Sequence, residues 1–242
     1  MKRLKNVLTH PLLTRYGWFY LALLATAAFS FWAGTRYAGS RMVQSRTDTS
    51  HLNTNVPGWV DSVRTQSNQK SMGNPDAPVT VVEYMDIECP FCERYAKTVL
   101  PQLVRDFVRN GQVHYVIKHF PLPERVHPNA MPGAVAAECA AQQGKFWEFK
   151  SLAMTNRKHQ SAETFRTLAR VVEVPNLDQF DRCFENRQTV RTVKTELQKG
   201  IDRGVEGTPT VFINGTSISG ARAYSRYRKA IQEALDEKSS SG

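Results

Sequence analysis

The sequence predicts an α/β domain in which a mixed β-sheet is flanked by helices and carries a helical insertion. Three observations lead to this prediction. A strand, a helix and a second strand follow one another early in the domain, helical patterns fill its middle, and a hairpin with a final helix ends it. Elements in this order form a sheet with helices on both faces.

The first three elements form a β-α-β unit. Residues 79–85 are mostly β-branched or apolar and follow a Pro-rich turn, which predicts a buried strand. Pro90 suits the first turn of the next helix, because its missing N–H has no partner to lose there. Apolar residues recur at helical spacing over residues 99–108, and Asn110-Gly111 ends the helix. Residues 113–118 form the second strand.

Helical periodicity dominates the region from about residue 128 to residue 200. The predicted helices cover residues 130–143, 146–154, 162–172, 177–184 and 189–200. Their aromatic side chains are predicted to pack in the core rather than to bind a cofactor. These aromatic residues are Phe146, Trp147, Phe149 and Phe165.

The last elements return to β-structure. Residues 210–213 and 216–219 are predicted strands, and Asn214-Gly215 between them supplies the positive φ angles of a type I′ turn. Residues 224–235 form a closing helix. We place the domain at residues 73–238, with the helical insertion over about residues 120–203.

Charge is distributed unevenly along the 242 residues. The net charge is +10, with 32 Lys and Arg against 22 Asp and Glu. Seven of the basic residues lie within residues 1–46, which contain no acid, so the rest of the chain carries 25 basic and 22 acidic residues. Because the remainder is nearly balanced and has no basic stripe interleaved with aromatic residues, we expect no nucleic-acid partner.

An uncharged stretch covers residues 16–35 and would extend about 30 Å as a helix, the thickness of a bilayer core. Trp18, Tyr20 and Trp32 lie near its ends, where amphipathic rings favour the membrane interfaces. Basic flanks on both sides suit anionic lipid headgroups. We predict a cytoplasmic basic segment at residues 1–15, a transmembrane anchor at 16–35 and a polar tether with one short helix at 36–72. The alternative is a signal peptide cleaved near Ala25-Thr26-Ala27.

Cys89 and Cys92 form a Cys-x-x-Cys pair at the start of the first helix. A Cys at a helix N-terminus faces unpaired N–H groups and the positive end of the helix dipole, so its thiolate is favoured. We predict that Cys89 is the nucleophile and Cys92 the resolving thiol. The alternative, a zinc site, needs two ligand pairs, and Cys139 and Cys183 have no neighbouring ligand at the usual spacing. We expect neither a metal nor a bound cofactor.

Several blocks of the sequence together resemble the DsbA-type thiol:disulfide oxidoreductases of the thioredoxin superfamily. The blocks are GNPDAPVT from Gly73, CPFC from Cys89, FPL from Phe120, HPNA from His127, QGKFW from Gln143, FDRC from Phe180 and GTPT from Gly207. They lie within about residues 73–235, over two thirds of the chain. The resemblance implies a thioredoxin fold.

The resemblance also implies further site residues. Thr208-Pro209 matches the family's cis-proline, which lies beside the active-site disulfide and presents its backbone to a substrate. Glu83 matches the buried acid that relays the proton of the resolving thiol; without the resemblance, an exposed strand carboxylate is the alternative. The best-known oxidases of the family carry Pro-His between their cysteines, whereas this chain carries Pro90-Phe91, so the direction of electron flow stays open.

The remaining cysteines, Cys139 and Cys183, lie on two of the predicted helices. We predict a structural disulfide between them, because an extracytoplasmic compartment oxidises cysteines that meet and such bonds add stability. The alternative is a pair of packed free thiols.

Taken together, these features predict a single-pass protein of the bacterial inner membrane whose C-terminal domain exchanges disulfides in the periplasm, as an oxidase of envelope or secreted proteins. The alternatives are a disulfide reductase or isomerase, and a non-catalytic envelope assembly protein on the same fold. The expected partners are protein thiols, a membrane redox protein that is a DsbB-like oxidase or a DsbD-like reductase, and membrane lipid around the N-terminal helix.

Overall fold

The computed structural model describes residues 49–61, 67–68 and 70–240. The chain divides into two compact units, residues 1–48 and 49–242, and every described residue belongs to the second. The transmembrane anchor predicted at residues 16–35 lies outside the described residues. Among the helices that are described, none is both long enough and apolar enough to cross a membrane.

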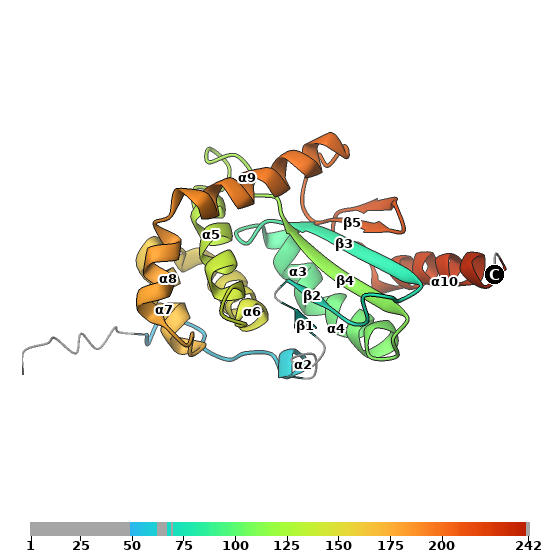
Figure 1. Ribbon diagram of the computed structural model, residues 1–242, viewed down its shortest axis with the longest axis horizontal. Coiled ribbons are helices and arrows are strands. Elements are labelled where there is room, and N and C mark those ends of the chain that lie inside the picture. The colour runs from blue at the N-terminus through green and yellow to red at the C-terminus, as the bar shows by residue number, and fades with distance from the viewer. Residues whose placement is uncertain (1–48, 62–66, 69, 241–242) are drawn as a thin grey trace, which may run out of the picture. The chain divides into compact units, whose positions relative to one another are not determined.

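A mixed sheet forms the centre of the second unit (Figure 1). Its strands, in sheet order, are β1 (Ser67–Asn68), β2 (Ser71–Met72), β4 (Val113–His119), β3 (Val79–Met85), β5 (Thr210–Ile213) and β6 (Thr216–Ser219). β3 and β4 pair in parallel, with Val79 opposite Val113, and the other described neighbours pair antiparallel. The predicted mixed sheet is confirmed, and β3 and β4 occupy its centre.

The crossover between β3 and β4 consists of α3 (Pro90–Thr98), α4 (Leu100–Leu103) and a π-helical turn, η2 (Val104–Val108). The sequence predicts one continuous helix here, but Val99 interrupts it, as the C-cap of α3 and the N-cap of α4. Pro90 and Pro101 each lie in the first turn of a helix, where a missing N–H leaves no bond unmade. Gly111 takes a φ of 72° and leads the chain into β4.

The helical insertion lies between β4 and β5. It contains α5 (Ala130–Ala141), α6 (Phe146–Thr155), the 3₁₀ turn η3 (Arg157–His159), α7 (Ala162–Val171), α8 (Leu177–Phe184) and α9 (Arg187–Asp202). Figure 1 shows α5 to α8 grouped at one end of the sheet and α9 running from this group toward β5. The side chains of Ser161, Asn176 and Asn186 accept backbone N–H groups at the starts of α7, α8 and α9. The four aromatic residues predicted for the core are at most 3% exposed.

The C-terminal part follows the sequence prediction closely. Asn214 and Gly215 join β5 to β6 with φ angles of 43° and 95°, as a type I′ turn requires. Helix α10 (Tyr224–Ser240) follows, and its Tyr227 and Ile231 are fully buried. It lies at the end of the sheet opposite the α5 to α8 group (Figure 1).

The start of the folded unit differs from the prediction of a polar tether over residues 36–72. The compact unit begins at Thr49, and a short helix, α2 (Gly58–Asp61), precedes the first strands. Val60 and Met72 are fully buried, and Met72 pairs with Tyr115 of β4. Leu52, Val56 and Trp59 also pack against the core, so the folded unit includes described residues that lie before the predicted boundary at residue 73.

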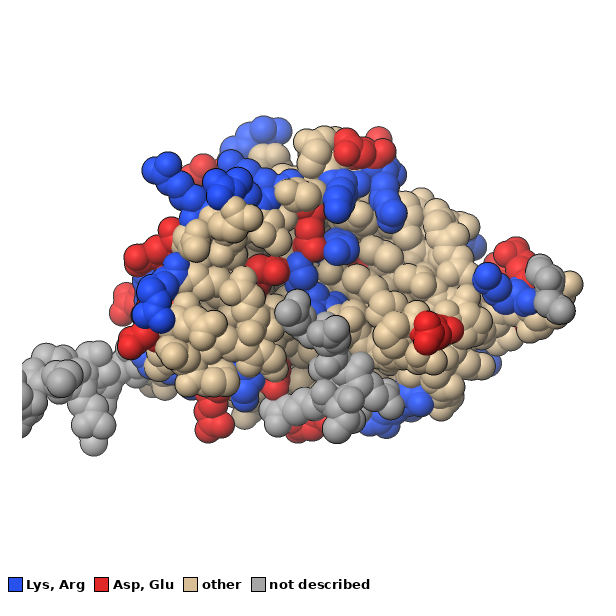
Figure 2. All heavy atoms as spheres, in the orientation of Figure 1, with Lys and Arg blue, Asp and Glu red and all other residues tan. Residues whose placement is uncertain are grey.

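The basic side chains on the viewed face gather over α9 (Figure 2). Its exposed basic residues are Arg187, Arg191, Lys194 and Lys199. The sequence of α9 contains no aromatic residue. The row of charges therefore lacks the interleaved aromatic side chains on which bases stack in single-stranded nucleic-acid sites.

Candidate active site

The two cysteines of the Cys-x-x-Cys pair lie at the junction between the central strand β3 and helix α3. Cys89 is the N-cap of α3, with an extended backbone, and Pro90 follows it in the first turn. Both thiols are free, with Cys89 3% exposed and Cys92 fully buried. An incoming thiolate therefore meets Cys89 first.

The surroundings of Cys89 favour its thiolate. The pKa of Cys89 is lowered to about 6, chiefly by a hydrogen bond from Cys92, although burial acts in the opposite direction. Thr208 and the backbone N–H groups of Phe91 and Cys92 add smaller favourable contributions. These N–H groups are the unpaired donors of the helix start. No imidazole is needed to lower the pKa of this thiol.

Cys92 is affected in the opposite sense. Burial raises its pKa well above the ordinary value, and the neighbouring Cys89 and the charge of Glu83 raise it further. Two cysteines three positions apart are therefore made different by their surroundings. Cys89 is suited to attack and to leave, and Cys92 remains a protonated thiol.

Thr208 and Pro209, 119 and 120 positions further along the chain, lie against Cys89. The Thr208-Pro209 bond is cis, and the Cys89 thiol donates to the carbonyl oxygen of Thr208 at 3.4 Å. Both residues are buried at the start of β5. The structure thus brings together two blocks, CPFC and GTPT, that the sequence separates widely.

Glu83 lies on β3 with its side chain completely buried, so the alternative of an exposed strand carboxylate is wrong. The hydroxyl of Tyr115 on β4 donates to Glu83 Oε2 at 2.5 Å, and the Tyr115 and Tyr95 hydroxyls are 3.3 Å apart. Burial raises the pKa of Glu83, while the positive charge of Lys150 and the Tyr115 hydrogen bond lower it. Glu83 therefore belongs to a buried polar network beneath Cys92.

Sequence reasoning missed Lys150, which acts on Glu83, as well as Tyr115 and Tyr95 of this network. Lys150 lies on α6, is 0% exposed, and has its ammonium 5.9 Å from the ring centroid of Trp147. Burial lowers its pKa, whereas Glu83 and Cys92 favour its charged form. The signal was present in the sequence, because a helix that is apolar on every side is buried and a lysine within it needs an acidic partner.

Phe91 lies between the two cysteines in the sequence and is exposed beside them. It is 52% exposed, and the guanidinium of Arg94 lies over its ring at 5.0 Å from the centroid. Arg94 also donates to the carbonyl oxygen of Ala221 at 3.1 Å. The residue that follows Pro90 between the cysteines is therefore a large apolar side chain that lies next to Cys89 in contact with solvent.

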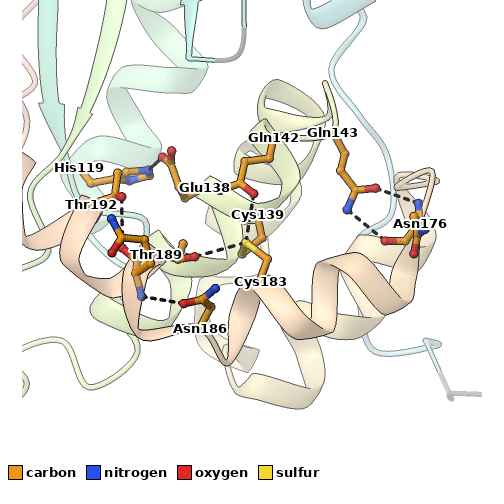
Figure 3. Close-up of a disulfide and its surroundings, with 11 residues drawn as sticks. His119, Glu138, Cys139, Gln142, Gln143, Asn176, Cys183, Asn186, Thr189 and Thr192 are labelled. Carbon is orange, nitrogen blue, oxygen red and sulfur yellow. Dashed lines mark hydrogen bonds and ion pairs between the residues drawn. A yellow bond between two sulfur atoms is a disulfide. The ribbon is translucent and has the colours of Figure 1, made fainter.

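The second cysteine pair lies in the helical insertion. Cys139 of α5 and Cys183 of α8 form a disulfide (Figure 3). Cys139 is fully buried, and the Cys183 sulfur lies 3.5 Å from the Thr189 hydroxyl. The two pairs thus differ: Cys139 and Cys183 are joined by a disulfide, whereas Cys89 and Cys92 are free thiols. Over the part of the chain that the structure describes, no group of three or more His, Cys, Asp or Glu side chains is arranged to hold a metal ion.

The family model described as Thioredoxin matches residues 65–233. The Na(+)/H(+) antiporter NhaA 3 of Salinispora tropica is 34% identical over 163 residues, which are 67% of this chain and 24% of the antiporter. The chain therefore spans about a quarter of that relative. The probable disulfide bond formation protein D of Bacillus cereus is 30% identical over 177 residues, which cover 70% of this chain and 80% of that protein.

Solved structures share the fold. DsbA1 of Wolbachia pipientis matches with a TM-score of 0.62 and 19% identity over 70% of this chain and 92% of its own. Oxidised BdbD of Bacillus subtilis matches with a TM-score of 0.61 and 21% identity over 70% and 94% of the two chains. A thioredoxin-like oxidoreductase of Silicibacter pomeroyi is 26% identical, with a TM-score of 0.58 over 73% and 97% of the two chains.

Proposed function

Because this chain belongs to the thioredoxin family, we propose that it is a DsbA-type thiol:disulfide oxidoreductase that works through Cys89 and Cys92. One observation carries the proposal. Cys89 caps a helix with its pKa lowered to about 6, while the neighbouring Cys92 is buried with its pKa raised. Such a pair combines a reactive thiolate with a protected resolving thiol.

The exchange begins from the Cys89–Cys92 disulfide. A substrate thiolate attacks the Cys89 sulfur, the bond to Cys92 breaks, and Cys92 leaves as a thiolate that takes up a proton. Glu83, the buried acid whose charge acts on Cys92, would supply that proton. A second substrate thiolate then attacks the substrate sulfur of the mixed disulfide and releases Cys89 as a thiolate. Two electrons pass from the substrate dithiol to the cysteine pair, and the substrate gains a disulfide.

We propose that net oxidation is the direction. A thiolate that the protein stabilises favours the reduced pair, and a stabilised reduced form makes the disulfide form a stronger oxidant. Phe91 in place of histidine motivates the reductase or isomerase alternative. A redox titration separates them: a potential near about −120 mV supports the oxidase, and one near about −270 mV supports the reductase.

The proposed setting is the outer side of the bacterial inner membrane, with the chain anchored through residues 16–35. The uncharged stretch and its basic flanks support the anchor, and the Cys139–Cys183 disulfide suits an oxidising compartment. Protein thiols would be the substrates, and a membrane protein related to DsbB or DsbD would renew the pair. Protease added to intact spheroplasts tests this arrangement, because it should digest the domain and leave a membrane-bound N-terminal fragment.

The test of the activity uses the full chain and a peptide with two reduced cysteines. Cys89→Ser should abolish peptide oxidation, whereas Cys92→Ser should accumulate a mixed disulfide between Cys89 and the peptide, which non-reducing mass spectrometry detects. Lys238→Ala, a change at an exposed residue of α10, is the matched control and should oxidise the peptide at the wild-type rate. Full activity of Cys89→Ser would overturn the proposal.

A further inference from the structure

We infer that Asp86 and His127 form a positioning pair that holds the peptide backbone of Asp86 against both redox cysteines. The inference rests on the proposed redox role of Cys89 and Cys92. It adds a contact that influences the equilibrium between their dithiol and disulfide forms. Asp86 follows the end of β3, and His127 belongs to residues 120–129, the segment that joins β4 to α5. We call residues 120–129 the 120s segment.

The backbone of Asp86 contacts both cysteines. Its carbonyl oxygen accepts the N–H of Cys89 at 3.2 Å. The backbone of Asp86 also acts on Cys92, because it lowers the pKa of that thiol against the larger effect of burial, which raises it. Asp86 is therefore the residue between β3 and α3 whose backbone acts on both Cys89 and Cys92. A shift in its position should change the surroundings of both thiols.

The Asp86 side chain is held as firmly as its backbone. Its carboxylate is 0% exposed and accepts three donors: the N–H of Glu88 at 2.7 Å, the N–H of Leu122 at 2.9 Å and Nδ1 of His127 at 2.7 Å. A buried carboxylate without such donors would be costly, so each donor constrains it. His127 is the one donor of the three that is a side chain, and with Leu122 it belongs to the 120s segment.

A second contact ties the same segments together. Glu88 accepts the N–H of Asn129 at 2.6 Å and its side-chain amide at 3.3 Å. Because Asn129 precedes α5, the two acids before Cys89 fasten both the middle and the end of the 120s segment to the active site. This second contact keeps the segment in place when the first is removed, so a change at His127 alters the fit at Asp86 without freeing the whole segment.

The experiment measures the equilibrium of the full chain with reduced and oxidised glutathione. His127→Ala should shift the Cys89–Cys92 pair toward the disulfide by a few-fold, less than the roughly tenfold that the loss of a whole hydrogen bond to a charged group is worth, because His127 acts only through Asp86. The direction follows because the backbone of Asp86 supports the reduced Cys92 sulfur. His127→Gln retains a side-chain donor and should recover most of the wild-type equilibrium.

Two further measurements separate a positioning role from a structural one. His114→Gln changes a histidine on β4 beside Thr80, away from the cysteines, and should leave the equilibrium unchanged. Asp86→Asn with His127→Ala should shift the equilibrium no further than the larger single change, because both act through one contact.

If His127→Ala lowers the melting temperature and leaves the glutathione equilibrium at its wild-type value, the inference is wrong. If the wild-type chain does not equilibrate with glutathione at all, the proposed function fails instead.

Discussion

Cys89 and Cys92 share one helix turn, yet hydrogen bonds and burial move their pKa values in opposite directions. Donors at the helix start stabilise negative charge on Cys89, and burial together with the charges of Cys89 and Glu83 opposes negative charge on Cys92. The order of attack therefore follows from position rather than from any difference in side-chain chemistry. The same reasoning explains why the replacement of histidine by Phe91 leaves a reactive thiolate.

The reactivity of Cys89 should follow the pH range in which it ionises. Alkylation of the reduced protein by iodoacetamide should rise with pH around a midpoint near 6, so that about nine tenths of Cys89 is thiolate at pH 7. Cys92 should stay unmodified over this range because its pKa is raised. Mass spectrometry of the quenched reaction assigns the modified cysteine. A midpoint near 8.5, the value of an ordinary thiol, would contradict the prediction.

Glu83 and Lys150 should behave as one unit in stability measurements. Both are 0% exposed, and each favours the charged form of the other. Lys150→Met removes the positive charge that favours the buried carboxylate, and Glu83→Gln removes the negative charge that favours the buried ammonium, so each change alone is destabilising. The double variant should recover part of the loss, with a coupling of about 0.5–3 kcal/mol in urea unfolding. Costs that simply add would show that the two residues act independently.

At the scale of elements, the helical insertion is fastened at several points. The disulfide between Cys139 and Cys183 joins α5 to α8, and side-chain caps define the starts of α7, α8 and α9. Near the disulfide, Gln143 and Asn176 also form two hydrogen bonds with each other (Figure 3). The insertion is therefore stabilised by local contacts that do not include the redox cysteines.

Removal of the disulfide should lower stability without changing the chemistry of the site. The bond closes a loop with a sequence separation of 44, for which the cost of removal is about 2–4 kcal/mol. The variant Cys139→Ala with Cys183→Ala should therefore unfold at lower urea concentration than wild type. At a temperature where it remains folded, its Cys89 should keep the wild-type alkylation midpoint. A shifted midpoint would show that the two cysteine pairs are coupled.

At the scale of the whole molecule, the sequence predicted the elements that depend on hydrophobic periodicity and on turn residues. The strands 79–85 and 210–213, the Asn214-Gly215 turn and the helix start at Pro90 follow from local rules and appear as expected. Contacts between distant residues did not follow from such rules. The apolar helix around Lys150 predicts an acidic partner for it, but no local pattern identifies that acid as Glu83 on β3.

The contacts of residues 49–72 with the folded unit could not be predicted from the sequence, for a related physical reason. The polar composition of residues 49–72 predicts a tether, yet Lys70 forms ion pairs with Glu138 at 2.7 Å and Glu196 at 2.8 Å. Polar residues that pair with buried acids stabilise a fold as apolar residues do, but hydropathy does not reveal them. The buried Val60 and Met72 complete the attachment.

Residues 49–72 should therefore contribute to the stability of the domain, and part of that contribution should depend on pH. A protein that begins at Gly73 loses the burial of Val60 and Met72, worth about 1.5–3 kcal/mol each, and should unfold at lower urea concentration than one that begins at Thr49. Burial raises the pKa of Glu138, but the hydrogen bond with His119 and the charge of Lys70 outweigh it and hold this pKa at about 2.

A carboxyl group whose pKa is depressed in the folded state stabilises the protein above its unfolded pKa, and this stabilisation is lost as the pH falls toward the folded value. Lys70→Met removes one cause of the depression at Glu138 and also at Glu196, whose pKa Lys70 lowers as well, so both acids contribute in the same direction. Its stability deficit relative to wild type should be largest above pH 4.5 and should shrink as the pH falls toward 2. Urea unfolding followed by circular dichroism at several pH values measures the difference, with Lys97→Met, at an exposed ion pair, as the control. A deficit that does not change with pH would mean that Lys70 stabilises the domain by packing and not through Glu138 or Glu196.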